Sequence, residues 1–146
     1  MLRRNNLMRI FCFFTGKNVM FTACAEFGGK YGPFSSDKTL VYNNVITNIG
    51  AGYDMTTGVF TSPVTGVYYI TFHCHGGTGL SLMKNGELVV AISDEKSGSD
   101  APDNGGNSAL LQLNKGDKVF VHLPANSSVW VSGHTTTFSG FLVNQL

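Results

Sequence analysis

Short apolar runs, separated by clusters of Gly, Asn, Asp, Ser and Pro, recur along the chain from Val19 to its C-terminal end. Runs of this length bounded by turn residues are typical of the strands of a sandwich or barrel. No stretch of ten or more residues keeps the period of an amphipathic helix. The pattern therefore predicts an all-β domain with about ten strands.

The strongest strand is predicted from Val67 to His75. Its alternate residues Tyr68, Ile70, Phe72 and Cys74 share one face, because neighbouring side chains of a strand point to opposite faces. The closing run, 138–143, is apolar on both faces. A strand of that kind is central in its sheet or is buried against a neighbouring subunit.

Two hairpins and several shorter strands complete the predicted architecture. Asn85-Gly86 joins strands at 80–84 and 87–93, because both residues tolerate the positive φ of a tight turn. A second hairpin joins 108–113 to 118–123. Shorter strands are predicted at 19–27, 40–42, 45–48, 58–61 and 129–131. The long polar loops 94–107 and 125–137 are candidates for binding, since such loops on a rigid scaffold commonly carry it.

Composition narrows the class of partner. The chain of 146 residues suits one domain, and its net charge of +1 comes without a Lys/Arg stripe after Arg9. Nucleic-acid binding is excluded, because it requires a concentrated positive surface. The 18 glycines follow no three-residue period, which excludes a collagen helix. No apolar run approaches the roughly 20 residues that span a bilayer.

The N-terminal segment is separated from the globular part, with residues 1–18 interpreted as a leader and 19–146 as the globular domain. Arg3 and Arg4 precede an apolar run at 7–14, as in a secretory signal. Arg9 interrupts this run and no small-x-small cleavage site follows it. An incorrect or truncated start and a disordered leader are the alternatives.

Three cysteines, Cys12, Cys24 and Cys74, leave at least one thiol unpaired within the chain. Cys24 and Cys74 lie in apolar strand patterns. Small buried hydrophobes are the favoured interpretation, and a disulfide between them is the alternative.

The stretch 48–72 resembles the signature of the C1q-domain family. The residues in step with that signature are Asn48, Tyr53, Phe60, Gly66, Tyr68 and Phe72. Tyr42 and Ile70 depart from it, since the family usually has Phe at both positions. The hairpin 84–87, the second hairpin 111–117 and the closing segment 137–142 match as well, so that the resemblance extends over about residues 17–146.

The resemblance implies an all-β, ten-stranded jelly-roll β-sandwich of the C1q/TNF type that forms homotrimers. It implies a secreted, extracellular, non-enzymatic recognition module that binds proteins, glycans or pathogen surfaces in innate immunity. The alternative is a secreted signalling ligand of cerebellin or tumour-necrosis-factor type. Tyr69, Phe141 and Val143 are the candidates for the trimer interface, because their strands are apolar on both faces.

Two metal hypotheses come from side-chain clusters. Asp94, Asp100 and Asp103 share one Gly-rich loop, where clustered carboxylate oxygens could hold calcium; a solvated acidic loop is the alternative. His73 and His75 lie on one strand face, but no third ligand is identifiable, and a polar outer face is favoured. No cofactor is expected to be required.

The remaining candidates lie in the polar loops. Asn104, Asn107, Trp130 and His134 are the predicted ligand-binding residues, although packing of Trp130 on the sandwich is the favoured interpretation of that residue. Asn126 begins an Asn-x-Ser sequon and is the glycosylation candidate. No nucleophile elbow accompanies the isolated histidines, so no enzyme is predicted.

Overall fold

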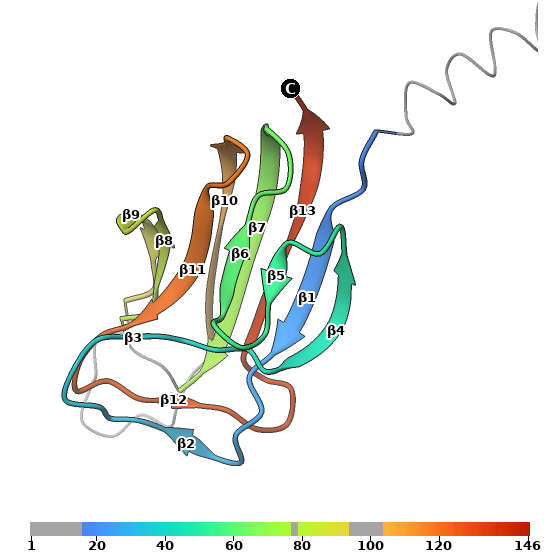
Figure 1. Cartoon of the computed structure of the whole chain (residues 1–146). Coiled ribbons are helices and arrows are strands. Elements are labelled where there is room, and N and C mark those ends of the chain that lie inside the picture. Colours follow the sequence, from blue (N-terminus) through green and yellow to red (C-terminus); the bar gives the residue numbers. More distant parts are fainter. Residues whose placement is uncertain (1–15, 77–78, 94–103) are drawn as a thin grey trace, which may run out of the picture.

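A computed structural model describes residues 16–76, 79–93 and 104–146. Within these ranges every regular element is a β-strand, and thirteen strands form two antiparallel sheets (Figure 1). The all-β prediction is confirmed. Both termini of the described chain lie at one end of the molecule, and β2 and β12 lie at the other, which we call the distal end.

Sheet A has seven strands, six of them in the order β2-β12-β7-β13-β1-β4. The seventh strand, β10, pairs with β7 along the edge opposite β13. Its strands are β1 (Met20–Cys24), β2 (Lys30–Tyr31), β4 (Asn44–Ile49), β7 (Gly66–His75), β10 (Asn104–Leu113), β12 (Val129–Trp130) and β13 (Thr137–Gln145). Of the two alternatives for the closing strand, the central position in its sheet is observed, because β13 lies between β7 and β1.

Sheet B has six strands in the order β5-β6-β11-β8-β9, with β3 paired to β11. Its strands are β3 (Lys38–Thr39), β5 (Tyr53–Asp54), β6 (Val59–Thr61), β8 (Ser81–Lys84), β9 (Glu87–Ala91) and β11 (Lys118–Leu123). The predicted Asn-Gly hairpin joins β8 to β9, and both Asn85 and Gly86 have positive φ.

The core is made by the facing sides of the two sheets. On β7 the predicted alternation is observed, since Tyr68, Ile70, Phe72 and Cys74 are all buried. From β1 and β13, Phe21 and Phe138 meet in an edge-to-face contact with ring centroids 4.9 Å apart. Such aromatic pairs add stabilisation beyond the area that they bury.

The predicted strand at 40–42 is wrong, because regular pairing there stops at Thr39. The hydroxyl of Tyr53 replaces a neighbouring strand at this point. It accepts a hydrogen bond from the backbone N–H of Tyr42 at 3.0 Å and donates one to the carbonyl of Tyr42 at 2.7 Å. Buried backbone groups require partners, and a single phenol supplies both.

The signature residues have structural roles. The side chain of Asn48 donates to the carbonyl of Tyr53 at 2.9 Å and so closes the turn between β4 and β5. Gly66 begins β7 where a Cβ would lie 2.6 Å from the carbonyl oxygen of Asn144. Phe60 and Phe72 fill the core.

Candidate functional site

An apolar row crosses five strands of sheet A on the face that is turned away from the core, which we call the outward face. Strand register aligns its members directly opposite one another: Leu110 (β10), Tyr69 (β7), Phe141 (β13), Met20 (β1) and Ile49 (β4). The exposed fraction is 38% for Met20, 46% for Phe141 and 67% for Leu110. Contiguous apolar surface of this kind marks an interaction site.

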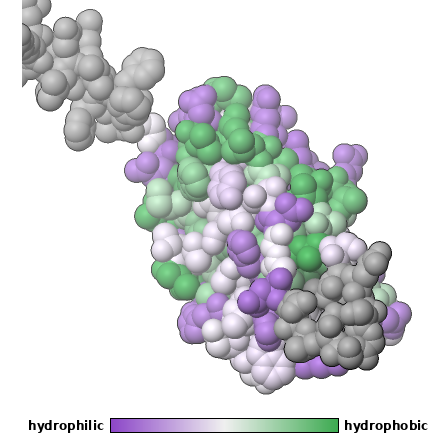
Figure 2. All heavy atoms as spheres, turned by 180° about the vertical axis from the view of Figure 1, so that it is seen from behind, coloured by the Kyte–Doolittle hydropathy of each residue, from purple (hydrophilic) through white to green (hydrophobic). Residues whose placement is uncertain are grey.

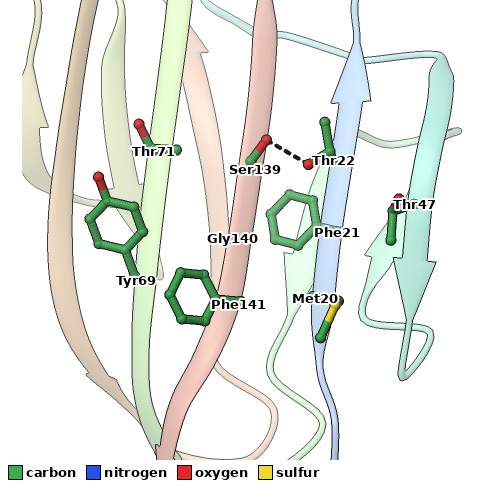
Figure 3. A pocket seen from close by; sticks show the side chains of 9 residues that line it. All are labelled: Met20, Phe21, Thr22, Thr47, Tyr69, Thr71, Ser139, Gly140 and Phe141. Atoms are coloured by element: carbon green, nitrogen blue, oxygen red, sulfur yellow. Dashed lines mark hydrogen bonds between the residues drawn. The ribbon is translucent and has the colours of Figure 1, made fainter.

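A row of hydroxyl side chains runs beside the apolar row, one step closer to the distal end. Its members are Ser108, Thr71, Ser139, Thr22 and Thr47, again one from each of the five strands. Thr22 and Ser139 are linked by a hydrogen bond of 2.9 Å between their hydroxyls (Figure 3). Most residues of the two rows line a shallow groove of about 490 Å³.

The outward face becomes more polar toward the distal end. The next row places Gly106, His73 and Thr137 side by side, and the last one places Asn104 beside His75 and His75 beside Trp130. Seen from behind, apolar side chains gather toward the end that carries the termini, whereas the opposite end is mainly polar (Figure 2). The face therefore has an apolar part near the termini and a polar part near the distal end.

The three predicted interface residues all lie on strands of sheet A. Tyr69 and Phe141 are neighbours in the apolar row, with ring centroids 5.7 Å apart. Val143 is 51% exposed and is the extra residue of a β-bulge between Leu142 and Asn144. The other three members of the row, Leu110, Met20 and Ile49, were not identified from the sequence.

Trp130 and His134 lie at the distal end. Trp130 is 44% exposed, so the expectation that it packs on the sandwich is wrong. His134 has positive φ, and its backbone N–H donates to the Glu26 carboxylate at 2.6 Å. The hydroxyl of Thr136 donates to the carbonyl of Trp130 at 2.6 Å. These bonds fix the segment between β12 and β13, which follows Trp130 and presents His134.

The prediction that Asn104 and Asn107 belong to a loop is wrong, because both lie in β10 and pair with β7. The Asn104 side-chain oxygen lies 2.9 Å from Nδ1 of His75 at the distal end. The Asn107 amide instead donates to the carbonyl of Ala91 at 3.0 Å, which ties β10 to β9. Asn104 is thus placed near Trp130, whereas Asn107 has a structural contact.

Asn126 is exposed, with positive φ, in the segment between β11 and β12. Its backbone N–H donates to the carbonyl of Phe34 at 2.7 Å, which holds the segment in place through the main chain. An exposed loop position is what a glycosylated asparagine requires.

The metal hypotheses gain no support from the described residues. Asp94, Asp100 and Asp103 lie outside them, so calcium stays a prediction. Within 16–76, 79–93 and 104–146, no group of three His, Cys, Asp or Glu side chains is placed to hold a metal ion. His73 and His75 hydrogen-bond to Thr71 and Asn104, respectively, rather than to a common point.

Cys24 and Cys74 are both buried, as predicted. Strand β13 separates the two strands that carry them, since Cys24 is opposite Thr137 and Thr137 is opposite His73. Burial raises the pKa of the Cys24 thiol, and the nearby charge of Glu26 raises it further. A thiol with a raised pKa is a poor nucleophile at neutral pH.

Carboxylates in the loops serve as local anchors. The pKa of Asp37 is lowered by a hydrogen bond from the backbone of Ala125 and by His122, which lies 3.3 Å away. The pKa of Asp117 is lowered first by the side chain of Asn85 and then by the backbone of Asn114. These bonds connect neighbouring turns and leave the outward face of sheet A without a carboxylate from either residue.

Among the described residues, no helix has the length and apolar character needed to cross a bilayer.

Comparison with known proteins places this geometry in a family. The C1q domain model matches residues 21–143. The chain is 32% identical over 138 residues to caprin-2 of Danio rerio, an alignment that covers 90% of the chain and 15% of that protein. It is 33% identical over 117 residues to a complement C1q subcomponent of Homo sapiens, which covers 76% of the chain and 46% of that protein. The chain therefore spans less than half of either relative.

Solved structures show the same fold. The globular domain of zebrafish complement 1qA superimposes with a TM-score of 0.66 at 21% identity, over 89% of this chain and all of that one. Eiger TNF from S. frugiperda superimposes with a TM-score of 0.69 at 14% identity, over 90% of this chain and 96% of that one. The fold is thus the jelly roll that C1q and TNF proteins share, and the match over residues 21–143 shows that this chain belongs to the C1q domain family.

Proposed function

We propose that the chain is a secreted, non-enzymatic recognition head of innate immunity that assembles as a homotrimer through the outward face of sheet A, from the apolar row as far as the row of Gly106, His73 and Thr137. It binds extracellular proteins, glycans or pathogen surfaces with its distal end. The observation that carries this proposal is the apolar row, which crosses five strands and is partly exposed in the single chain.

A sister copy is the occupant that best fits the apolar row. Soluble proteins rarely leave contiguous apolar area uncovered, and most soluble oligomers are closed assemblies of identical copies. The hydroxyl row beside it offers donors and acceptors that can be satisfied across the same interface. Membership of the C1q family supports both the trimer and binding without turnover.

The distal end is the part of such a trimer that remains open to ligand. It lies away from the termini and presents Trp130, which is 44% exposed, together with His75, Asn104 and His134. Tryptophan is enriched among the residues that dominate binding energy. Its neighbours supply hydrogen-bond donors and acceptors around an exposed aromatic surface.

A binding screen with a matched variant pair tests this assignment. The secreted chain and its Trp130→Ala and Leu88→Ala variants are applied to arrays of microbial glycans, lipopolysaccharide and receptor ectodomains. Leu88 is 65% exposed on sheet B and serves as the control for loss of an exposed apolar side chain. We expect Trp130→Ala to weaken binding at least tenfold and Leu88→Ala to leave it unchanged. Equal binding by all three proteins would contradict a distal recognition site.

A signalling ligand is the second candidate, because the fold superimposes on Eiger TNF as well as on a C1q head. The same screen separates the two functions. Binding to glycans or lipopolysaccharide supports recognition of surfaces, whereas selective binding to a receptor ectodomain supports signalling.

A further inference from the structure

His73 is an imidazole on the face through which we expect copies to assemble. It is exposed on β7, two residues beyond Thr71 of the hydroxyl row and four beyond Tyr69 of the apolar row. Strand register places it between Gly106 of β10 and Thr137 of β13. A copy that covers the outward face of sheet A beyond the hydroxyl row would cover His73.

The ring of His73 lies over Gly106 of the neighbouring strand β10. It occupies the space that a Cβ at position 106 would take, so that Gly106 is what allows this placement. Its Nε2 lies 3.1 Å from the hydroxyl of Thr71, which also approaches the carbonyl of Asn107 at 3.4 Å. In the described part of the chain, no hydrogen bond joins Nδ1 to an acceptor. A second proton on the ring would therefore add a charge and a donor with no partner in the part of the chain that the structure describes.

Among residues 16–76, 79–93 and 104–146, the charged and titratable groups near His73 do not offset a positive charge. On its own face of β7 they are Tyr69 and His75, whereas Tyr68 and Cys74 are buried on the opposite face. Cys24 lies beyond Thr137. Lys30 lies opposite Trp130 at the distal end, and the Glu26 carboxylate is held by the backbone of His134. Among the described residues, no carboxylate forms an ion pair with His73.

We propose that His73 makes the assembly of copies pH-dependent, so that the trimer forms at neutral pH and separates in mildly acidic solution. This inference rests on the proposed assembly through sheet A. Imidazole gains its proton between about pH 8 and pH 5. Covering the face removes the ring from water, which disfavours the charged form. Symmetric copies also place like charges in one interface.

The direction and size of the pH effect on assembly follow from the protons that assembly releases. Because assembly favours the neutral ring, it releases protons, and the association constant rises with pH through the range in which imidazole titrates. Release of about one proton per copy over one pH unit changes the constant by about tenfold per copy, or about 1,000-fold for three copies. Assembly is therefore complete above this range and weakens as pH falls through it.

Sedimentation of the full chain near its dissociation midpoint, at about pH 7.5 and about pH 5.5, tests the inference. The variants are His73→Gln, which keeps a side chain able to bond Thr71 but carries no proton switch, and His134→Gln, which changes an exposed histidine of the distal loop. We expect the natural chain and His134→Gln to shift toward monomer at the lower pH. His73→Gln should stay assembled at both values, with near-UV circular dichroism reporting an intact fold.

The outcomes separate this inference from the proposed function. Assembly of the natural chain at both pH values would overturn the pH switch and leave the trimer in place. A monomer at both values would overturn the proposed assembly and the switch together. Dissociation of His73→Gln at the lower pH, to the same extent as the natural chain, would assign the effect to other groups and overturn the role of His73.

Discussion

Replacing Phe141 with serine should dissociate the trimer while leaving the single chain folded. Phe141 is 46% exposed in the single chain, next to Tyr69 at the centre of the apolar row. A phenylalanine presents about 200 Å², so that covering this fraction removes about 90 Å² from water. At ~25 cal/mol per Å² this contributes ~2.3 kcal/mol per copy and ~7 kcal/mol for three copies.

The association constant should then fall by up to about 100,000-fold, because each 1.4 kcal/mol corresponds to about a factor of ten. Ordering of side chains on association lowers the observed effect, and we expect a fall of at least about 1,000-fold. Sedimentation equilibrium over a dilution series measures it for the natural chain, Phe141→Ser and Leu88→Ser. The control removes a more exposed apolar residue from sheet B, since Leu88 is 65% exposed. An unchanged midpoint for Phe141→Ser, or an equal fall for Leu88→Ser, would refute the assignment of the interface to sheet A.

Three further predictions concern the core and the turns. Phe138→Ala should lower the free energy of unfolding by about 3–5 kcal/mol in chemical denaturation, because Phe138 is fully buried among aromatic rings; a loss below about 1 kcal/mol would contradict the packing described. Tyr53→Phe should lower the free energy of unfolding by about 2–4 kcal/mol, since it leaves both buried backbone groups of Tyr42 unpaired. Tyr42→Phe should be neutral or stabilising, since the buried Tyr42 hydroxyl has no hydrogen-bond partner among the described residues. The reverse order of the two variants in the same denaturation assay would refute the roles given to the two hydroxyls. Asp117→Asn should lower the midpoint of thermal unfolding at neutral pH. The difference from the natural chain should vanish as pH falls through the lowered pKa of Asp117, because a carboxyl whose pKa is depressed on folding stabilises the fold only while it is ionised. A difference that persists at the lowest pH would assign the effect to the shape of the side chain rather than to its charge.

The sequence predicted the parts of the fold that depend on local pattern. Alternation from Tyr68 to Cys74 identified the core face of β7, and Asn85-Gly86 identified the hairpin, because both signals lie within a few residues of chain. Two members of the apolar row, Tyr69 and Phe141, were found because their strands are apolar on both faces.

The remaining members of the row depend on pairing between distant strands. Met20, Ile49 and Leu110 become neighbours of Phe141 and Tyr69 only through the register of β1, β4 and β10. A single exposed methionine or leucine is ordinary on a protein surface, and neither residue type signals an interface by itself. Their alignment could not be read without the sheet order.

Asn104 was assigned to a loop for a related reason. The segment Asn104-Gly105-Gly106-Asn107 has turn composition, yet it pairs with β7 along its length. The glycines leave room for side chains from neighbouring elements, since a Cβ at Gly105 would meet Ile92 and one at Gly106 would meet His73. Glycine in a strand often marks such a close approach, and composition alone does not distinguish it from a turn.

Methionine oxidation of the assembled chain tests most directly whether sister copies cover the outward face of sheet A. Met20 belongs to the apolar row and is 38% exposed in the single chain, whereas Met55 is 52% exposed in the turn between β5 and β6 of sheet B. Brief hydroxyl-radical labelling, read by mass spectrometry above and below the dissociation midpoint, compares the two within one sample. Assembly through sheet A predicts that Met20 becomes protected on association while Met55 reacts at an unchanged rate. Oxidation of Met20 at the same rate in both states, in a chain that does associate, would contradict the central claim.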